Sequence, residues 1–131
     1  MLEYVKENSH TLAIIIRSNY KSENIKFFTE NNSNFQVGYM NRNTDYEVKP
    51  HYHTKQTRII NTTSEVLLIK NGKINVDFFD SNKKILEKKI LNTGDIIVFL
   101  EGGHGVQFLE KTEIIEIKQG PYMEENDKNY I

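Results

Sequence analysis

Two histidines stand two residues apart in the segment His51-Tyr52-His53, and this spacing can serve a metal ion. In an extended strand, residues i and i+2 project from the same face, so the two imidazole rings can converge on one point. Neutral imidazole nitrogens are common ligands of divalent metals. The motif alone fits two histidines near a loop equally well, so other residues must decide between these interpretations.

A third histidine, His104, follows the glycine pair Gly102-Gly103. Val106 and Phe108 share its phase in an alternating segment, and their apolar character favours a core-facing position. We therefore expect His104 to point inward as well. The alternative is a turn histidine beside two glycines. The fourth histidine, His10, has no partner in the sequence and is interpreted as incidental.

Glu65 begins the apolar segment Glu-Val-Leu-Leu-Ile-Lys. If its side chain faces inward, Leu67 and Ile69 share its face, as a barrel interior requires. If it faces outward, it is a solvated residue at the end of a strand. Glu101, close to His104 in the sequence, is either a second acid–base group or a loop-surface residue.

Composition limits what these residues can serve. The chain has 131 residues, enough for one domain with a hydrophobic core, and it contains no cysteine, which excludes disulfides, thiol catalysis and cysteine-ligated metals. The 17 basic and 18 acidic residues nearly cancel, which argues against a general nucleic-acid binder and against an anionic membrane surface. The sequence shows neither a membrane-length apolar run nor a signal peptide, so we predict a cytoplasmic protein.

Short strands separated by turn signals dominate the chain and predict an all-β fold. The expected strands cover residues 11–17, 35–40, 65–70, 73–80, 85–91, 96–100, 106–109 and 113–118. Residues 22–28 fit either a short helical turn or a strand. Residues 122–131 form a polar tail after Pro121.

The dipeptide Asn71-Gly72 is the strongest turn signal in the chain. It favours a type I′ hairpin, in which both central residues have positive φ. The next segment alternates cleanly, with Ile74, Val76 and Phe78 on one face. We therefore predict a hairpin turn at Asn71-Gly72.

The spacing of these motifs resembles the cupin superfamily. One cupin motif reads His-x-His, then Glu, then six residues and Gly, and His51, His53, Glu65 and Gly72 stand at those places. The second motif runs from Gly through a strand to a Gly turn and His, and it is matched by Gly94, Gly102 and His104. The resemblance covers about residues 35 to 118.

This resemblance implies a double-stranded β-helix, or jelly-roll, barrel as one domain over residues 1–131, with N-terminal strands in 1–34. It implies that His51, His53, Glu65 and His104 ligate one divalent ion: Fe, Mn, Co, Ni or Zn. Such a ligand set leaves positions open for water or substrate. The eleven residues Thr54 to Ser64 between His53 and Glu65 exceed the usual interval, and this insert is expected to form a loop or strand over the pocket mouth.

Three residues are candidate ligand contacts: Arg58, Tyr52 and Phe108. Arg58 lies in the insert, and its guanidinium can hold a phosphate or carboxylate with two hydrogen bonds. A plain salt bridge is the alternative for Arg58, and Tyr52 leaves the same choice open.

The chain is also similar to small stand-alone cupins of bacterial surface-polysaccharide and sugar-nucleotide gene clusters. The similarity rests on Gly38-Tyr39-Met40, Pro50-His51, the Gly102–Gly105 segment and Lys118-Gln119-Gly120-Pro121-Tyr122. It implies a metal-binding cupin that binds or acts on a sugar or sugar nucleotide, as an isomerase or epimerase would. The alternatives are an Fe(II)-dependent oxygenase and a non-enzymatic carbohydrate-binding barrel. We also predict a homodimer, because an Ile-rich strand at residues 11–17 would be an exposed apolar edge if it were unpaired.

Overall fold

The computed structural model describes all residues, 1–131, and consists of ten β-strands and no helix. It therefore contains no helix with the length and apolar character needed to cross a membrane. The strands are β1 (Leu2–Glu7), β2 (His10–Ile16), β3 (Ile25–Phe27), β4 (Gly38–Met40), β5 (Glu65–Asn71), β6 (Lys73–Phe79), β7 (Ile85–Asn92), β8 (Ile96–Phe99), β9 (Gly103–Phe108) and β10 (Glu113–Lys118).

The chain divides into two compact units, and each is described by itself. The first, here called the sandwich unit, consists of Met1–Tyr20 and Thr62–Ile131. The second, here called the 21–61 unit, consists of Lys21–Asn61.

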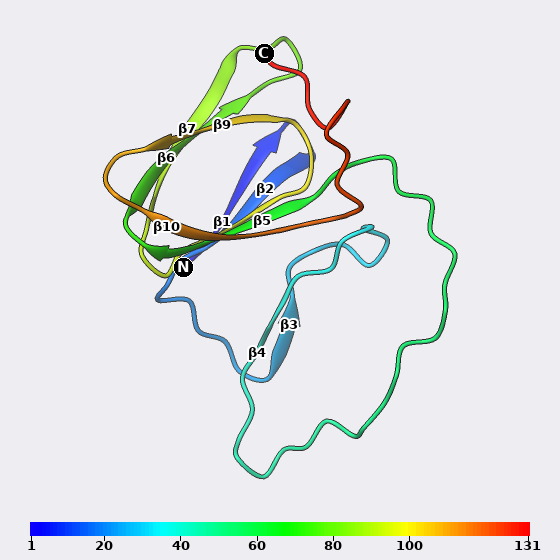
Figure 1. Cartoon of the computed structure of the whole chain (residues 1–131). Coiled ribbons are helices and arrows are strands. Elements are labelled where there is room, and N and C mark those ends of the chain that lie inside the picture. The colour runs from blue at the N-terminus through cyan, green and yellow to red at the C-terminus, as the bar shows by residue number, and fades with distance from the viewer. The chain divides into compact units, whose positions relative to one another are not determined.

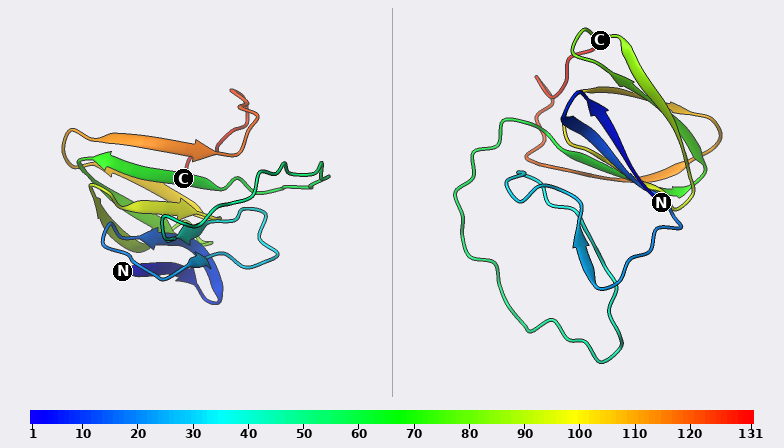
Figure 2. Two further views of the ribbon diagram at one scale, coloured as in Figure 1. Left: turned by 90° about the horizontal axis from the view of Figure 1, so that it is seen from below. Right: turned by 180° about the vertical axis from the view of Figure 1, so that it is seen from behind.

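The sandwich unit contains two antiparallel sheets. The larger has the strand order β1-β2-β8-β5-β10 and the smaller the order β7-β6-β9 (Figure 1). In the left view of Figure 2 the larger sheet runs from orange β10 through green β5 to the dark blue β1. The all-β prediction is thus confirmed at the level of antiparallel sheets.

The core of the sandwich unit is built from residues that alternate along strands of both sheets. Ile74, Val76 and Phe78, which the sequence places on one face of β6, are all buried in it. The larger sheet also contributes buried apolar residues, such as Ile69 and Ile97. In a β-sandwich, apolar side chains from the inner faces of both sheets interdigitate and exclude water between the layers. The full cluster is Val5, Ala13, Ile15, Leu67, Ile69, Ile74, Val76, Phe78, Leu91, Ile97 and Phe99, with Val106 and Ile114 packed against it.

The Ile-rich strand β2 lies inside the larger sheet, between β1 and β8. The premise of the dimer prediction, a lone apolar edge at residues 11–17, is therefore wrong. The residues before it form β1, which pairs with β2 in an antiparallel ladder and satisfies its backbone on that side. The dimer itself stays a prediction.

The expected hairpin at Asn71-Gly72 is also wrong. Strand β5 pairs with β8 and β10, and β6 pairs with β7 and β9, so the chain passes from one sheet to the other at this dipeptide. A type I′ turn requires positive φ at both central residues. Here Gly72 has positive φ, at 109°, and Asn71 does not. The corner is held by threonines instead, since the Gly72 amide donates to Thr93 Oγ1 at 2.9 Å and the Lys73 amide to Thr112 Oγ1 at 3.1 Å.

Replacing Gly72 with alanine is expected to destabilise the fold by about 1–3 kcal/mol. A Cβ at this position would lie 2.7 Å from the Thr112 Cα and 2.8 Å from the Lys111 carbonyl oxygen, and the positive φ disfavours any side chain. Urea denaturation measures the effect. Gly105→Ala is the matched control, because its Cβ would meet only the Phe79 ring at 3.8 Å. Equal stability of the two variants would contradict this explanation.

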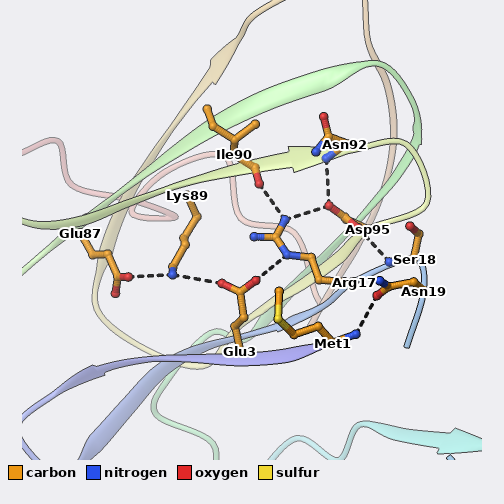
Figure 3. Close-up of polar contacts among 10 residues, drawn as sticks. All are labelled: Met1, Glu3, Arg17, Ser18, Asn19, Glu87, Lys89, Ile90, Asn92 and Asp95. Carbon is orange, nitrogen blue, oxygen red and sulfur yellow. Dashed lines mark hydrogen bonds and ion pairs between the residues drawn. The ribbon is translucent and has the colours of Figure 1, made fainter. Parts of the chain in front are cut away.

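A polar cluster ties the two sheets together at Arg17, just after β2 (Figure 3). The Arg17 Nε donates to Glu3 Oε1 of β1 at 2.6 Å, and its Nη1 donates to the Ile90 carbonyl of β7 at 2.7 Å and to Asp95 Oδ2 at 2.9 Å. Lys89 of β7 completes the cluster with an ion pair to Glu3 at 3.0 Å. One guanidinium therefore joins strands of both layers.

Replacing Glu3 with glutamine is expected to reduce the acid sensitivity of the fold. The hydrogen bond from Arg17 lowers the pKa of Glu3, against an opposing effect of burial, and Lys89 lowers it further. The ionised side chain therefore stabilises the fold fully above its unfolded pKa of about 4.3, and this contribution is lost as pH falls through the lower folded pKa. Urea denaturation from about pH 3 to pH 7 should show the difference between the two proteins shrinking in acid. A difference that grows in acid would contradict it.

The 21–61 unit contains one small ladder. Strands β3 and β4 pair antiparallel, from Ile25 opposite Met40 to Phe27 opposite Gly38. Residues 25–27 are thus a strand, which resolves the choice between helix and strand. Residues 41–61 of this unit form no strand, so the insert after His53 is a loop there.

Candidate functional site

The sheet register brings the inward-facing polar residues of the sandwich unit to one end of its core. Glu65 begins β5 and lies opposite Phe99 of β8 on one side and Lys118 of β10 on the other. His104 lies opposite Phe78 in the smaller sheet. Because opposite residues of a ladder share a face, Glu65 and His104 project toward each other from different sheets.

Glu65 and His104 form a close pair. The Glu65 Oε2 lies 3.4 Å from the His104 Nε2, with side chains 20% and 28% exposed. The Phe99 ring stacks on the imidazole with centroids 3.8 Å apart and planes 13° from parallel, which fixes the orientation of the ring. A carboxylate and an imidazole that are partly buried and held in register can exchange a proton.

The protonation of the pair follows from its surroundings. The contact with His104 lowers the pKa of Glu65, against an opposing effect of burial, so the carboxylate is ionised near neutral pH. The His104 Nδ1 is buried and has no hydrogen-bond partner. Since a hydrogen on Nδ1 would lack an acceptor, the neutral ring carries its hydrogen on Nε2, next to the Glu65 carboxylate.

The pair lines a pocket of about 700 Å³ in the sandwich unit. Glu116 and Lys118 of β10 line it as well, and the Lys118 ammonium lies 3.5 Å from Glu116 and 3.6 Å from Asp127. Burial lowers the pKa of Lys118, but the carboxylates of Asp127 and Glu116 raise it by more, so the net shift is upward. The Lys118 side chain is therefore positively charged at neutral pH and lies beside the carboxylates of the pocket.

The C-terminal segment forms part of this pocket, which the sequence did not predict. Residues Asp127 to Ile131 line it, and the Ile131 side chain lies so close to Gly103 that a Cβ there would approach Ile131 Cδ1 to 2.5 Å. Only the polar character of residues 122–131 is evident from the sequence. The signal that could have indicated packing is the aromatic and apolar pair Tyr130-Ile131 at the end of a charged segment.

His51 and His53 lie together in the 21–61 unit. Their ring centroids are 5.2 Å apart in an edge-to-face arrangement, and both residues are exposed. They do not lie in a strand, so the expected same-face strand geometry is wrong and the contact arises in a loop. The His51 Nδ1 lies 2.8 Å from the Lys49 carbonyl oxygen and must donate to it, which leaves Nε2 with a free lone pair.

The predicted metal ligands thus fall into two pairs, one in each unit. Within neither unit do three or more histidine, aspartate or glutamate side chains form a group that could hold a metal ion. A four-ligand centre of His51, His53, Glu65 and His104 draws on both units and stays a prediction.

The remaining candidate residues lie elsewhere. Phe108 lies opposite buried Ile74 in the β6–β9 ladder, on the same face as His104, but it is 60% exposed at the end of β9 and does not line the pocket of His104. Tyr52 and Arg58 are exposed and lie in the strandless part of the 21–61 unit. His10 has a partner that the sequence did not reveal, since its Nδ1 lies 3.8 Å from Glu101 Oε1. The roles predicted for Tyr52, Arg58 and Phe108 in ligand binding stay predictions.

Comparison with protein-family models, with curated proteins and with solved structures finds no match to this chain. Functional inference therefore rests on the geometry of the two units.

Proposed function

We propose that the protein is an isomerase or epimerase that moves a proton next to a carbonyl group of a sugar or sugar nucleotide. The observation that carries this proposal is the Glu65–His104 pair, with Glu65 Oε2 and His104 Nε2 3.4 Å apart in a pocket. A carboxylate base beside an imidazole that donates a hydrogen bond is a recurrent arrangement for removing a proton α to a carbonyl.

The two residues have different roles in this proposal. Glu65 is ionised and accepts the proton from carbon, since its pKa is lowered by His104. The His104 Nε2 hydrogen faces Glu65 in the free protein. When the substrate is bound, it is donated to the carbonyl oxygen instead and stabilises the negative charge that develops there. The Phe99 ring, stacked at 3.8 Å, keeps the imidazole in the plane that this donation requires.

The remaining lining of the pocket suits a small polar ligand. A volume of about 700 Å³ lies within the range of small-molecule sites. Glu116 and Tyr130 supply groups that can bind hydroxyls, and the Lys118 ammonium, paired with Glu116 and Asp127, can donate to a hydroxyl or carbonyl oxygen. A sugar with a carbonyl group, free or linked to a nucleotide, combines these features.

The strand pairing supports the further proposal that the fold is a cupin-type jelly roll. The hairpin β6–β7 is flanked by the pair β5–β8, and the chain changes sheet at Asn71-Gly72 and again between β7 and β8. Nested antiparallel pairs that alternate between two sheets are typical of jelly rolls.

Hydrogen exchange in D₂O tests the proposed activity. A panel of aldoses, ketoses and nucleotide-linked keto sugars is incubated with the full chain, and proton NMR follows the signal of the carbon next to each carbonyl. At least one sugar should lose this signal faster with protein than without it. Binding without exchange for every member would overturn the enzyme and favour a carbohydrate-binding barrel.

A metal-dependent version of this function is the second candidate, and the His51 ring favours it. In metal-ligating histidines, the N–H of the second ring nitrogen commonly donates a hydrogen bond to a backbone carbonyl, as the Nδ1–H of His51 does to the Lys49 carbonyl. Its free Nε2, together with His53, Glu65 and His104, would hold one divalent ion. The ion would supply a Lewis acid that polarises the substrate carbonyl.

Titration calorimetry with Co²⁺, Ni²⁺, Zn²⁺ and Mn²⁺ checks this candidate. His51→Ala and His104→Ala are expected to abolish binding of one equivalent of metal, whereas His10→Ala should retain it. Binding should weaken below about pH 6, because a protonated imidazole cannot ligate. Full metal occupancy in the His51→Ala protein would contradict the candidate.

A further inference from the structure

The 21–61 unit contains a pocket of about 470 Å³ that has no part in the proposed reaction. It lies where the β3–β4 ladder ends, because Asn24 precedes β3 and Asn41 follows β4. The Asn41 amide donates to the Asn24 carbonyl at 2.7 Å, and its side-chain amide donates to the Ser22 carbonyl at 3.1 Å. These bonds close the end of the ladder and hold the two walls of the pocket together.

Arg42 is fixed within this pocket. Its Nη1 donates to Asn24 Oδ1 at 3.1 Å, and its guanidinium lies over the Tyr46 ring, 4.4 Å from the centroid. Its Nε is buried and has no hydrogen-bond partner. The guanidinium is therefore oriented in advance. Its buried Nε has no surface for a ligand to reach, so a ligand would bind through the terminal nitrogens Nη1 and Nη2.

Other polar groups of the pocket are unused. The side chains of Glu23, Asn43 and Asp45 line it, are exposed to solvent, and make no hydrogen bond or ion pair within the protein. The carboxylates accept hydrogen bonds only, the guanidinium donates only, and the amide does both. The pocket thus presents acceptors and donors side by side within a small volume.

The charges of the lining select among ligand classes. A phosphate or carboxylate ligand would be attracted by Arg42 but repelled by Glu23 and Asp45. An amine would be attracted by Glu23 and Asp45 but repelled by Arg42. A hydroxyl group donates and accepts at once, so it can bridge a carboxylate and a guanidinium or amide without either conflict. Tyr46 is 49% exposed as a residue, and the part of its ring that Arg42 leaves uncovered adds an apolar surface on which the C–H face of a sugar ring can rest.

We infer that this pocket, formed around Arg42 and Tyr46 in the 21–61 unit, binds a neutral polyhydroxylated ligand, namely a sugar ring. The inference goes beyond the proposed function, because it uses none of the residues of the Glu65–His104 pocket. It assigns to the 21–61 unit a carbohydrate-binding site of its own.

The test is an amide NMR titration of the full chain with D-glucose, D-galactose, D-mannose and N-acetyl-D-glucosamine, and with inorganic phosphate and methylammonium as charged probes. At least one sugar should give saturable shifts at the Asn24, Asn43 and Tyr46 amides, and neither charged probe should. Saturation by phosphate or methylammonium alone, or by no probe, would overturn the inference.

Variants locate the site. Asp45→Asn removes one carboxylate acceptor, and Arg42→Lys keeps the charge but removes the planar donor fork, so each should weaken sugar binding about tenfold. Glu47→Gln, an exposed carboxylate in the same unit but outside this pocket, is the matched control for Asp45→Asn and should bind as wild type does. Unchanged amide shifts at Lys26 and Tyr39 show that the ladder is intact in each variant. Undiminished binding by both Asp45→Asn and Arg42→Lys would overturn the site.

The outcome is separable from that of the proposed function. Glu65→Gln should leave sugar affinity at the Arg42 pocket unchanged, and shifts at the Glu65 and His104 amides would report the other pocket. A failure of hydrogen exchange in D₂O therefore leaves this inference standing, and the converse also holds.

Discussion

Replacing Glu65 with glutamine is expected to slow hydrogen exchange into the substrate by about 10²–10⁴-fold. The amide keeps the size of the side chain and its position opposite Phe99, but it cannot accept a proton from carbon. Proton NMR in D₂O measures the rate directly. Because glutamine also removes the charge next to the His104 Nε2, the substrate affinity is measured separately, and the loss should lie in the rate at saturation.

A further variant and a matched control test the role of Glu65 as the base. His104→Gln should slow exchange less than Glu65→Gln, since a glutamine amide can still donate a hydrogen bond toward the carbonyl oxygen. Glu113→Gln is the matched control, because Glu113 is an exposed carboxylate on β10 that does not line the pocket. Exchange at the wild-type rate in Glu65→Gln would contradict the base role, whatever His104→Gln does.

Alternation along the chain was sufficient to predict most of the strands. In β6, Ile74, Val76 and Phe78 recur with the period of a strand, and all three are buried. Such a pattern records which face meets the core, since one face must be apolar and the other can face water. It records nothing about which strand is the neighbour.

The errors arose where the choice of neighbour mattered. Asn71-Gly72 has the composition of a hairpin turn, yet β5 and β6 belong to different sheets. Positive φ at Gly72 serves a corner that closely approaches Thr112, a residue 40 positions away in sequence. Local turn chemistry cannot distinguish these cases, because a left-handed residue is needed in both.

The candidate site was accessible to sequence reasoning in part. The inward phase of His104 and of Glu65 could be proposed from Val106 and Leu67, and the structure places the two side chains 3.4 Å apart. The part of the pocket wall formed by Tyr130 and Ile131 could not be predicted, because a polar segment gives no indication of where it packs. The Arg42–Tyr46 contact in the 21–61 unit likewise depends on a loop conformation that no periodic pattern describes.

The turn signal did not reveal the structural role of Asp95. In the segment Asn92-Thr93-Gly94-Asp95 it has the character of a turn former, but its side chain is only 4% exposed. Its Oδ1 accepts from the Ser18 amide at 2.8 Å, and its Oδ2 accepts from Arg17 Nη1 at 2.9 Å and the Asn92 amide at 3.0 Å (Figure 3). One buried carboxylate thus satisfies two backbone amides and one guanidinium.

Replacing Asp95 with alanine is therefore expected to destabilise the fold by about 3–5 kcal/mol. The variant leaves the Ser18 and Asn92 amides without their acceptor in a partly buried place, and each unsatisfied donor costs about 1–3 kcal/mol. It also removes one of the two carboxylates that neutralise Arg17, while Glu3 remains. Urea denaturation at pH 7 measures the loss as a lower midpoint with an unchanged slope.

Three further variants separate the causes of this loss. Asp95→Asn retains one oxygen acceptor and should cost less than Asp95→Ala. Glu87→Ala, which breaks only the exposed contact with Lys89 in the same cluster, should change stability by at most about 1 kcal/mol. In a double-mutant cycle, Arg17→Met should cost less in the Asp95→Ala background than in wild type, because the two side chains share a hydrogen bond. An Asp95→Ala protein as stable as Glu87→Ala would show that this cluster does not hold the two sheets together.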